Sequence, residues 1–239
     1  MEEITIKYNE GDDDPEMRIT DAGMMTLATS FATCLESVTL KYCENVTDDG
    51  LAVLAICHRL RCIEAEDCEN ITGSFLEQVT DSCRNLEKIA CFGSEVNFRA
   101  IASRCPLLRD ITLCHATDEK VKLLVQGCPL LTHLRLYGGE KKYGNAEQLP
   151  GVSDISLAAI TAGLRNLELL ATVRPRDYYS ESKDGVTDAG LYKLLQNCPH
   201  ITFLRTGVKI STGSRLHRMI LQRKIIVAGL FNEYCRWER

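Results

Sequence analysis

Twelve cysteines are the residues of this 239-residue chain with the clearest potential for chemistry. Converging thiolates could bind zinc, and a cysteine beside a histidine, as in Cys57-His58 and Cys114-His115, could act as a nucleophile. However, the chain has no C-x-x-C pair, and adjacent residues on a strand point to opposite faces. It also lacks a Gly-rich phosphate loop and the H-E-x-x-H and G-x-S-x-G motifs. We therefore predict no enzyme activity, catalytic residue, metal site, cofactor or small-molecule substrate.

The composition is typical of a soluble globular protein, with 45% hydrophobic and 26% charged residues. No apolar run reaches the roughly 18 residues of a membrane-spanning helix, and the first residues lack the basic and apolar regions of a secretory signal. We expect a cytoplasmic protein without a membrane partner, in which the cysteines remain reduced. A net charge of -5 without a basic stripe argues against nucleic acid as a partner.

The two ends of the chain carry opposite charge. Residues 1–21 contain eight acidic and two basic side chains, whereas residues 209–239 contain seven basic and two acidic ones. Such polarity could orient the molecule in an assembly, although solvated ends of opposite sign are the simpler interpretation.

A repeating phrase organises the positions of the cysteines. It has the form C-x-x-[LI]-x-x-[LI]-x-[LACT] and begins at Cys57, Cys83, Cys105, Cys128 and Cys198, with weaker copies at Ala32 and Leu164. The alternation at the end of the phrase predicts a short strand with one buried face. Ile4 to Tyr8 predicts an earlier strand, which gives about eight in all.

A second phrase predicts the helices between these strands. It occurs as ITDAGM (19–24), VTDDGL (46–51), VSDISL (152–157) and VTDAGL (186–191), and Thr117-Asp118 is similar. Threonine and aspartate oxygens can accept hydrogen bonds from free N-H groups at a helix start. Leu191, Leu194 and Leu195 then form one apolar stripe. Each unit therefore reads as strand, turn and helix.

The repeat spacing indicates a solenoid interrupted by two insertions. Starts of the first phrase are separated by 25, 26, 22, 23, 36 and 34 residues, and repeats of 20 to 29 residues are typical of leucine-rich repeats. The two longer intervals contain insertions at 137–151 and 173–185, which are rich in turn-forming and charged residues.

Together the two phrases resemble the cysteine-containing leucine-rich repeats of F-box/leucine-rich-repeat proteins and of antagonist of mitotic exit network proteins. The match is fullest from Ala32 to Leu76 and extends over roughly residues 17–207. It departs from the family pattern at Ala32 and Leu164, in place of the first cysteine, and in lacking Thr-Asp before Phe98. The resemblance implies an α/β fold of about 7–8 repeats: a curved horseshoe with parallel strands on the concave face and helices on the convex face.

In this register most cysteines occupy packing positions. Cys57, Cys83, Cys105, Cys128 and Cys198 share the return from helix to strand, and Cys43 and Cys68 share a position just after a strand. Because cysteine behaves as a small hydrophobic residue, core packing accounts for them without a metal.

The concave face is the expected binding surface of such a solenoid. The period-two pattern selects the side chains that point outward, and their aromatic and aliphatic members suggest a protein partner. We predict partner contacts from Lys41, Glu64, Glu66, Phe92, Arg135, Tyr137, Leu169, Val173, Phe203 and Arg205, and from Tyr178 and Tyr179 of the second insertion.

The C-terminal segment follows the last predicted strand. We divide the chain into a repeat domain at 1–210 and a tail at 211–239, in which Ser214 to Lys224 predicts an amphipathic basic helix. The tail either caps the open core of the last repeat or docks elsewhere, on the concave patch or on a partner.

Two functions fit these features. The first is a non-enzymatic scaffold or interaction subunit of a larger assembly. A resemblance to small leucine-rich subunits of the nexin-dynein regulatory complex implies coiled-coil partners and a cytoskeletal location in the ciliary or flagellar axoneme. The second is the substrate-recognition module of an SCF-type ubiquitin ligase. Because Ile4 to Tyr8 already predicts a repeat strand, no F-box is expected, and recruitment to a ligase would need another subunit.

Overall fold

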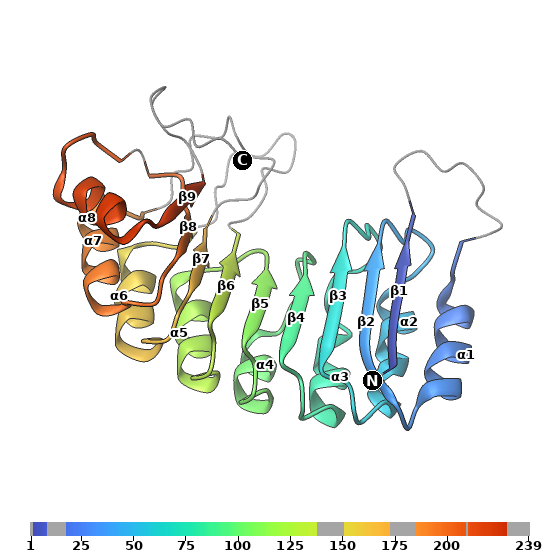
Figure 1. Ribbon diagram of the computed structural model, residues 1–239. Coiled ribbons are helices and arrows are strands. Elements are labelled where there is room, and N and C mark those ends of the chain that lie inside the picture. The colour runs from blue at the N-terminus through green and yellow to red at the C-terminus, as the bar shows by residue number, and fades with distance from the viewer. Residues whose placement is uncertain (1, 9–17, 138–150, 173–184, 209, 229–239) are drawn as a thin grey trace. The chain divides into compact units, whose positions relative to one another are not determined.

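The computed structural model describes residues 2–8, 18–137, 151–172, 185–208 and 210–228. The chain divides into two compact units, one of residues 1–114 and 126–130 and one of residues 115–125 and 131–239. In each unit the strands form one layer and the helices the other (Figure 1).

The first unit alternates parallel strands with short helices. Its elements are β1 (Glu2–Lys7), α1 (Asp21–Phe31), β2 (Leu35–Lys41), α2 (Asp48–Ala52) with the 3-10 helix η2 (Val53–Ile56), β3 (Cys62–Glu66), α3 (Leu76–Ser82), β4 (Lys88–Cys91), α4 (Phe98–Arg104) and β5 (Asp110–Leu113). Each strand pairs in parallel with the next one along the chain.

The second unit continues the same alternation. Its elements are most of α5 (Asp118–Gly127), then β6 (His133–Leu136), α6 (Asp154–Gly163), β7 (Leu169–Ala171), α7 (Asp188–Asn197), β8 (Phe203–Arg205), α8 (Arg215–Arg223) and β9 (Ile226–Ala228). Strands β6 to β9 also pair in parallel and in chain order. The described residues thus contain nine strands rather than about eight.

The core lies between the strand layer and the helix layer. Alternate strand residues such as Val38, Ile63 and Ile89 occupy matching register positions and are fully buried. The other side chains of each strand stand on the opposite surface, which we call the strand face.

The segment after residue 210 continues the repeats. Helix α8 packs against α7, and β9 pairs with β8 through Phe203 and Ile226. Arg223 holds this packing, because its guanidinium donates hydrogen bonds of 2.6–3.1 Å to the carbonyl oxygens of Leu195, Cys198, Pro199 and Ile201. Residues 211–228 therefore cover the last repeat with a helix and a strand of their own.

Candidate protein-interaction surface

The strand face of the first unit consists of polar rows that run across the strands. The parallel register aligns Ser37, Cys62, Lys88 and Asp110 in one row and Thr39, Glu64, Ala90 and Thr112 in the next. Lys41 and Glu66 follow as neighbours in a third row. The register thus brings together side chains that lie more than 20 residues apart in the sequence.

Ion pairs across strands neutralise most of the charge in these rows. Lys41 pairs with Glu66, and the Lys88 ammonium lies 2.9 Å from a Glu64 carboxylate oxygen. The hydrogen bond from Glu66 raises the pKa of Lys41 above its ordinary value. Burial alone would lower the pKa of Lys88, but the hydrogen bond and charge of Glu64 outweigh it and raise that pKa. Both lysines are therefore charged at neutral pH.

The strand face of the second unit has a different character. One row contains His133, Leu169, Phe203 and Ile226, and the next contains Arg135, Ala171, Arg205 and Ala228. The Arg205 guanidinium lies 5.9 Å from the centre of the Phe203 ring. Neither row contains a carboxylate, so the described strand residues of this unit present apolar and cationic groups.

Most of the predicted contact residues stand in these rows or next to them. Lys41, Glu64, Glu66, Arg135, Leu169, Phe203 and Arg205 are half-buried on the strand face, and Phe92 is half-buried directly after β4. Val173, Tyr178 and Tyr179 lie outside the described residues. The use of these side chains by a partner remains a prediction.

Tyr137 is a correction. We predicted an outward contact residue, but its side chain is only 4% exposed. Strand β6 ends at Leu136, and the Tyr137 carbonyl oxygen accepts a hydrogen bond of 3.2 Å from the Ala116 N-H. The period-two rule fails here because the chain leaves the strand one residue before Tyr137. Cys114, directly after β5, is buried for the same reason.

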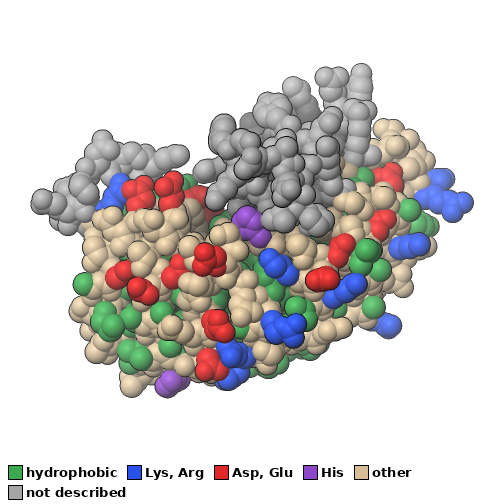
Figure 2. Space-filling view, turned by 180° about the vertical axis from the view of Figure 1, so that it is seen from behind, with side chains coloured by type: hydrophobic (Ala, Val, Ile, Leu, Met, Phe, Trp, Pro, Cys, Tyr) green, Lys and Arg blue, Asp and Glu red, His purple; other side chains and the backbone are tan. Residues whose placement is uncertain are grey.

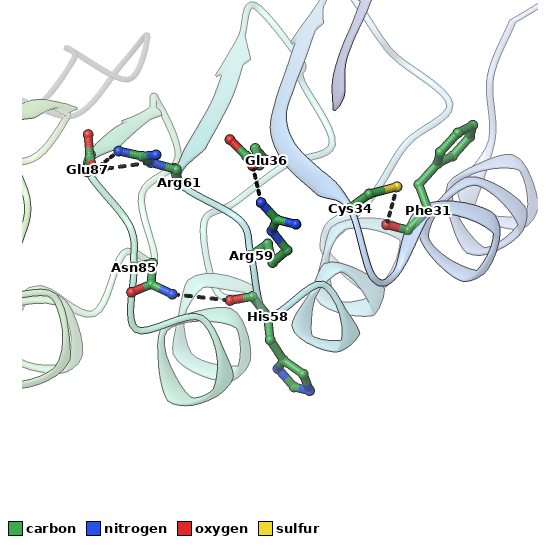
Figure 3. Close-up of polar contacts among 8 residues, drawn as sticks. All are labelled: Phe31, Cys34, Glu36, His58, Arg59, Arg61, Asn85 and Glu87. Atoms are coloured by element: carbon green, nitrogen blue, oxygen red, sulfur yellow. Dashed lines mark hydrogen bonds and ion pairs between the residues drawn. The ribbon is translucent and has the colours of Figure 1, made fainter. Parts of the chain in front are cut away.

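Alternating charges border the strands of the first unit at their N-terminal ends (Figure 3). Arg61 donates a hydrogen bond of 3.1 Å from Nε to Glu87, and Arg59 donates one of 2.8 Å to Glu36. In the first four copies of the cysteine-leucine phrase, the residue that follows the first leucine alternates in charge. These residues are Glu36, Arg61, Glu87 and Arg109. Our sequence reasoning missed this alternation, although aligning the repeats would have revealed it.

Aspartates at the starts of α1, α2, α5 and α6 each link their repeat to the following one. The Asp21 carboxylate accepts hydrogen bonds from the Thr47 N-H at 2.8 Å and the Thr47 hydroxyl at 2.7 Å. Asp154 binds Thr187 in the same way, at 2.8 and 2.6 Å. Asp48 and Asp118 make corresponding contacts with Thr72 and with Ser153.

These contacts refine the predicted capping role of the Thr-Asp pairs. Thr47 and Thr187 do cap their helices, accepting hydrogen bonds from the N-H groups of Asp49 and Gly190, but the Thr20 hydroxyl caps nothing. The aspartate acts mainly between repeats. Gly50, two residues after Asp48, leaves room for the Asp21 carboxylate of the preceding repeat. A Cβ atom at Gly50 would lie 2.1 Å from Asp21 Oδ1.

Comparison with known proteins gives relatives for this arrangement. The chain is similar to F-box/LRR-repeat protein 22 of Arabidopsis thaliana, with 27% identity over 160 residues that cover 64% of this chain and 47% of that protein. F-box/LRR-repeat protein 9 of the same organism is 25% identical over 138 residues, 55% of this chain and 49% of that protein. The chain thus spans about half the length of these relatives. No family model matches it.

A solved structure supports the fold. The crystal structure of the Rad7 and Elc1 complex in yeast contains a chain that matches with a TM-score of 0.61 and 16% identity, over 80% of this chain and 49% of that one. The fold is a leucine-rich repeat solenoid. At this identity the likeness concerns the fold alone.

The cysteines at the return from helix to strand in the leucine-rich repeats lie in the core. Cys57, Cys83, Cys105, Cys128 and Cys198 are fully buried, and the Cys57 thiol lies 3.7 Å from the Ala28 carbonyl oxygen of the preceding helix. Burial raises the pKa of Cys83, Cys105 and Cys128 to about 12, so these thiols are protonated and poorly reactive.

Cys57 and His58 are not arranged as a nucleophile and its base. The Cys57 side chain is buried, while the His58 ring is exposed and points away from the neighbouring polar contacts (Figure 3). In the described part of the chain, no three His, Cys, Asp or Glu side chains are grouped so as to hold a metal ion. No described helix is both long and apolar enough to cross a membrane.

The face opposite to the view of Figure 1 also mixes side chains of different kinds. Figure 2 shows acidic, basic and apolar side chains interspersed there rather than gathered by type. Of the strand rows described above, those of the second unit combine apolar and cationic side chains without a carboxylate.

Proposed function

We propose that this chain is a non-enzymatic leucine-rich-repeat interaction subunit that binds a protein partner through its strand face. The rows of the second unit carry the proposal. Leu169 and Phe203 offer apolar area, and Arg135 and Arg205 supply positive charge beside it. Aromatic and arginine side chains dominate the binding energy of many interfaces. The partner segment that fits this surface has apolar and acidic side chains.

The test is affinity purification of the whole chain from cells, with a strand-face variant and a matched control. Leu169→Asp combined with Arg205→Glu changes the proposed contact, whereas Lys193→Glu changes an exposed charge on α7. Circular dichroism checks that both variants fold. Partners retained by the wild type and by Lys193→Glu but lost by the strand-face variant support the proposal. Partners that bind all three chains equally would place binding elsewhere.

A role in substrate recognition for a ubiquitin ligase is the second candidate. The names of the two Arabidopsis relatives favour it, and a chain in the Rad7 and Elc1 complex shares the fold. The same purification tests this role, because adaptor and cullin subunits would be recovered with the chain. Their absence under conditions that retain other partners would count against it.

The nexin-dynein assignment rests on the sequence resemblance alone, and the relatives add nothing to it. Coiled-coil axonemal partners and an axonemal location would distinguish this scaffold from a ligase subunit. Localisation of the tagged chain in ciliated cells is the direct test, and a uniform cytoplasmic signal would speak for the general interaction role.

A further inference from the structure

Two thiols meet at the C-terminal ends of β2 and β3, away from the second-unit rows that carry the proposed partner contact. Cys43 follows shortly after the end of β2, and Cys68 holds the same position after β3. The residues just before them, Tyr42 and Asp67, share a left-handed backbone with φ angles of 55° and 51°. The two turns therefore leave the sheet in the same way, which keeps the two cysteines side by side.

The backbone spacing at this point suits a disulfide bond. The Tyr42 N-H donates a hydrogen bond of 3.1 Å to the Glu66 carbonyl oxygen, so the two segments are still paired where β2 has ended. Paired strands lie about 4.8 Å apart, and the Cα atoms of disulfide-bonded cysteines lie about 4.4–6.8 Å apart. The Cys43 N-H already donates a hydrogen bond of 3.4 Å to the Cys68 sulfur. Forming the bond therefore requires rotation of the two side chains rather than separation of the strands.

The two thiols differ in exposure and in protonation. Cys43 is fully buried, whereas Cys68 is 9% exposed. The hydrogen bond with the Cys43 thiol, helped by the Cys43 N-H, lowers the pKa of Cys68 below its ordinary value of 9.0, although burial and the charges of Asp67 and Glu66 act against it. The same thiol-thiol hydrogen bond, together with burial, raises the pKa of Cys43. Cys68 is therefore the thiol that ionises first, and Cys43 keeps its proton.

Exposure alone would select other cysteines. Cys34 and Cys62 are both half-buried and more exposed than Cys68. Burial nevertheless raises the pKa of Cys62 to about 11, which disfavours its thiolate. Oxidation-sensitive cysteines combine thiolate character and access with a neighbouring thiol that can complete a disulfide. Cys68 has all three.

We propose that Cys68 and Cys43 form a peroxide-sensitive thiol pair that converts reversibly to a disulfide. In the first step the Cys68 thiolate attacks one oxygen atom of hydrogen peroxide. A sulfur-oxygen bond forms, the oxygen-oxygen bond breaks, and the departing hydroxide takes up a proton to give water. In the second step the Cys43 sulfur attacks the sulfur of the Cys68 sulfenic acid. The sulfur-sulfur bond forms, the sulfur-oxygen bond breaks, and a second hydroxide leaves as water with the Cys43 proton.

The electrons balance, because the two thiols lose two electrons and one peroxide gains them to become two waters. The disulfide would tie the turn after β2 to the turn after β3, next to the Lys41–Glu66 ion pair of the strand face. A dithiol reductant restores the two thiols by exchange. Disulfides of this transient kind are the ones found in reducing compartments.

The test exposes the full-length chain to hydrogen peroxide near neutral pH, blocks the remaining thiols with iodoacetamide and maps the cysteines by mass spectrometry. Digestion with trypsin and Glu-C isolates the pair, because it releases residues 42–44 and 67–69, each with one cysteine. We expect the two peptides to be recovered as one disulfide-linked species after peroxide treatment. Dithiothreitol added before the blocking step should restore both free thiols.

Three variants assign the roles of the two cysteines. In Cys43→Ser no disulfide can form, and dimedone, which labels sulfenic acids, should label Cys68 at least about tenfold faster than Cys62. In Cys68→Ser we expect neither the disulfide nor a label on Cys43. Cys62→Ser is the matched control, because it removes a more exposed thiol, and it should form the disulfide at the wild-type rate. Circular dichroism checks that each variant folds, and the wild-type map holds even where one does not.

Three results would overturn the proposal. The first is a folded wild type without the linked peptides under a treatment that oxidises the urea-unfolded chain. The second is oxidation of Cys62 as fast as that of Cys68. The third is sulfinic acid at Cys68 of the wild type in place of the disulfide, since Cys43 would then not reach the sulfenic acid.

Discussion

Replacing Gly50 by alanine tests the contact between neighbouring repeats most directly. Alanine favours a helix over glycine by about 1 kcal/mol, so propensity alone predicts a more stable protein. The structure predicts the opposite, because the added Cβ atom would lie 2.1 Å from Asp21 Oδ1 and 2.8 Å from Asp21 Cγ. The carboxylate must then leave the Thr47 N-H and hydroxyl, and hydrogen bonds to charged groups contribute about 1.5–3 kcal/mol each. With partial relaxation, we expect Gly50→Ala to lower the free energy of unfolding by about 3 kcal/mol.

Urea unfolding followed by circular dichroism measures this change, and two further variants isolate its cause. Gly23 is the equivalent glycine in the first copy of the Thr-Asp phrase, at residues 19–24. A Cβ atom there would meet only the Ile19 side chain, at 2.9 and 3.6 Å. The Ile19 side chain must shift to admit the methyl group, which offsets part of the helix preference of alanine, so Gly23→Ala should change the free energy of unfolding by less than about 1 kcal/mol. In an Asp21→Ala background, Gly50→Ala should also lose most of its cost. Additive effects of Asp21→Ala and Gly50→Ala, or a stabilised Gly50→Ala single variant, would refute the reasoning.

Three further outcomes are expected. Hydrogen bonds from Thr72, Phe75 and Gly73 outweigh burial and lower the pKa of Asp48 below its ordinary value of 3.8. The stability that Asp48 contributes is therefore present above about pH 4, and it is lost as the pH falls through the lower pKa of the folded state. Asp48→Asn should flatten this acid dependence in pH-dependent urea unfolding, while Asp49→Asn at the exposed neighbouring position should leave it intact. The buried thiols of Cys83, Cys105 and Cys128 have pKa values of about 12. At pH 8 they should react with iodoacetamide roughly 1000-fold more slowly in the folded protein than in urea, which mass spectrometry can measure. Equal rates in the two conditions would contradict their burial. Arg223→Ala removes the hydrogen bonds to four carbonyl oxygens and should speed amide exchange in β9 more than in β7, whereas Arg218→Ala should have little effect.

Much of the fold could be predicted from local patterns. The apolar alternation of Leu35–Lys41 and Cys62–Glu66 marks strands, and the Thr-Asp phrase marks the starts of α2 and α7, because these signals depend on a few neighbouring residues. The limits of the strands were harder to predict. Tyr137 was misplaced since a strand can end at any residue where the sheet hydrogen bonds stop.

The candidate site was only partly predictable because it depends on register. The alternation predicts that Leu169, Phe203 and Arg205 point outward, but their alignment with Ile226 became visible only when β9 proved to pair with β8. The role of Asp21 was missed for a similar reason. Its partner Thr47 lies 26 residues away, and a helix cap accounts for the same local sequence.

The aspartate contacts also bear on how this protein can change in length. Asp118 and Ser153 are 35 residues apart and Asp48 and Thr72 only 24, yet both pairs form the same hydrogen bonds. The carboxylate fixes where the next helix begins regardless of how much chain intervenes, and lengthening a loop adds little closure entropy. Segments can therefore be inserted between a strand and the next helix without disturbing the stacking of the repeats. Transfer of a whole repeat to another place in the chain would instead separate its aspartate from the threonine or serine of the following repeat.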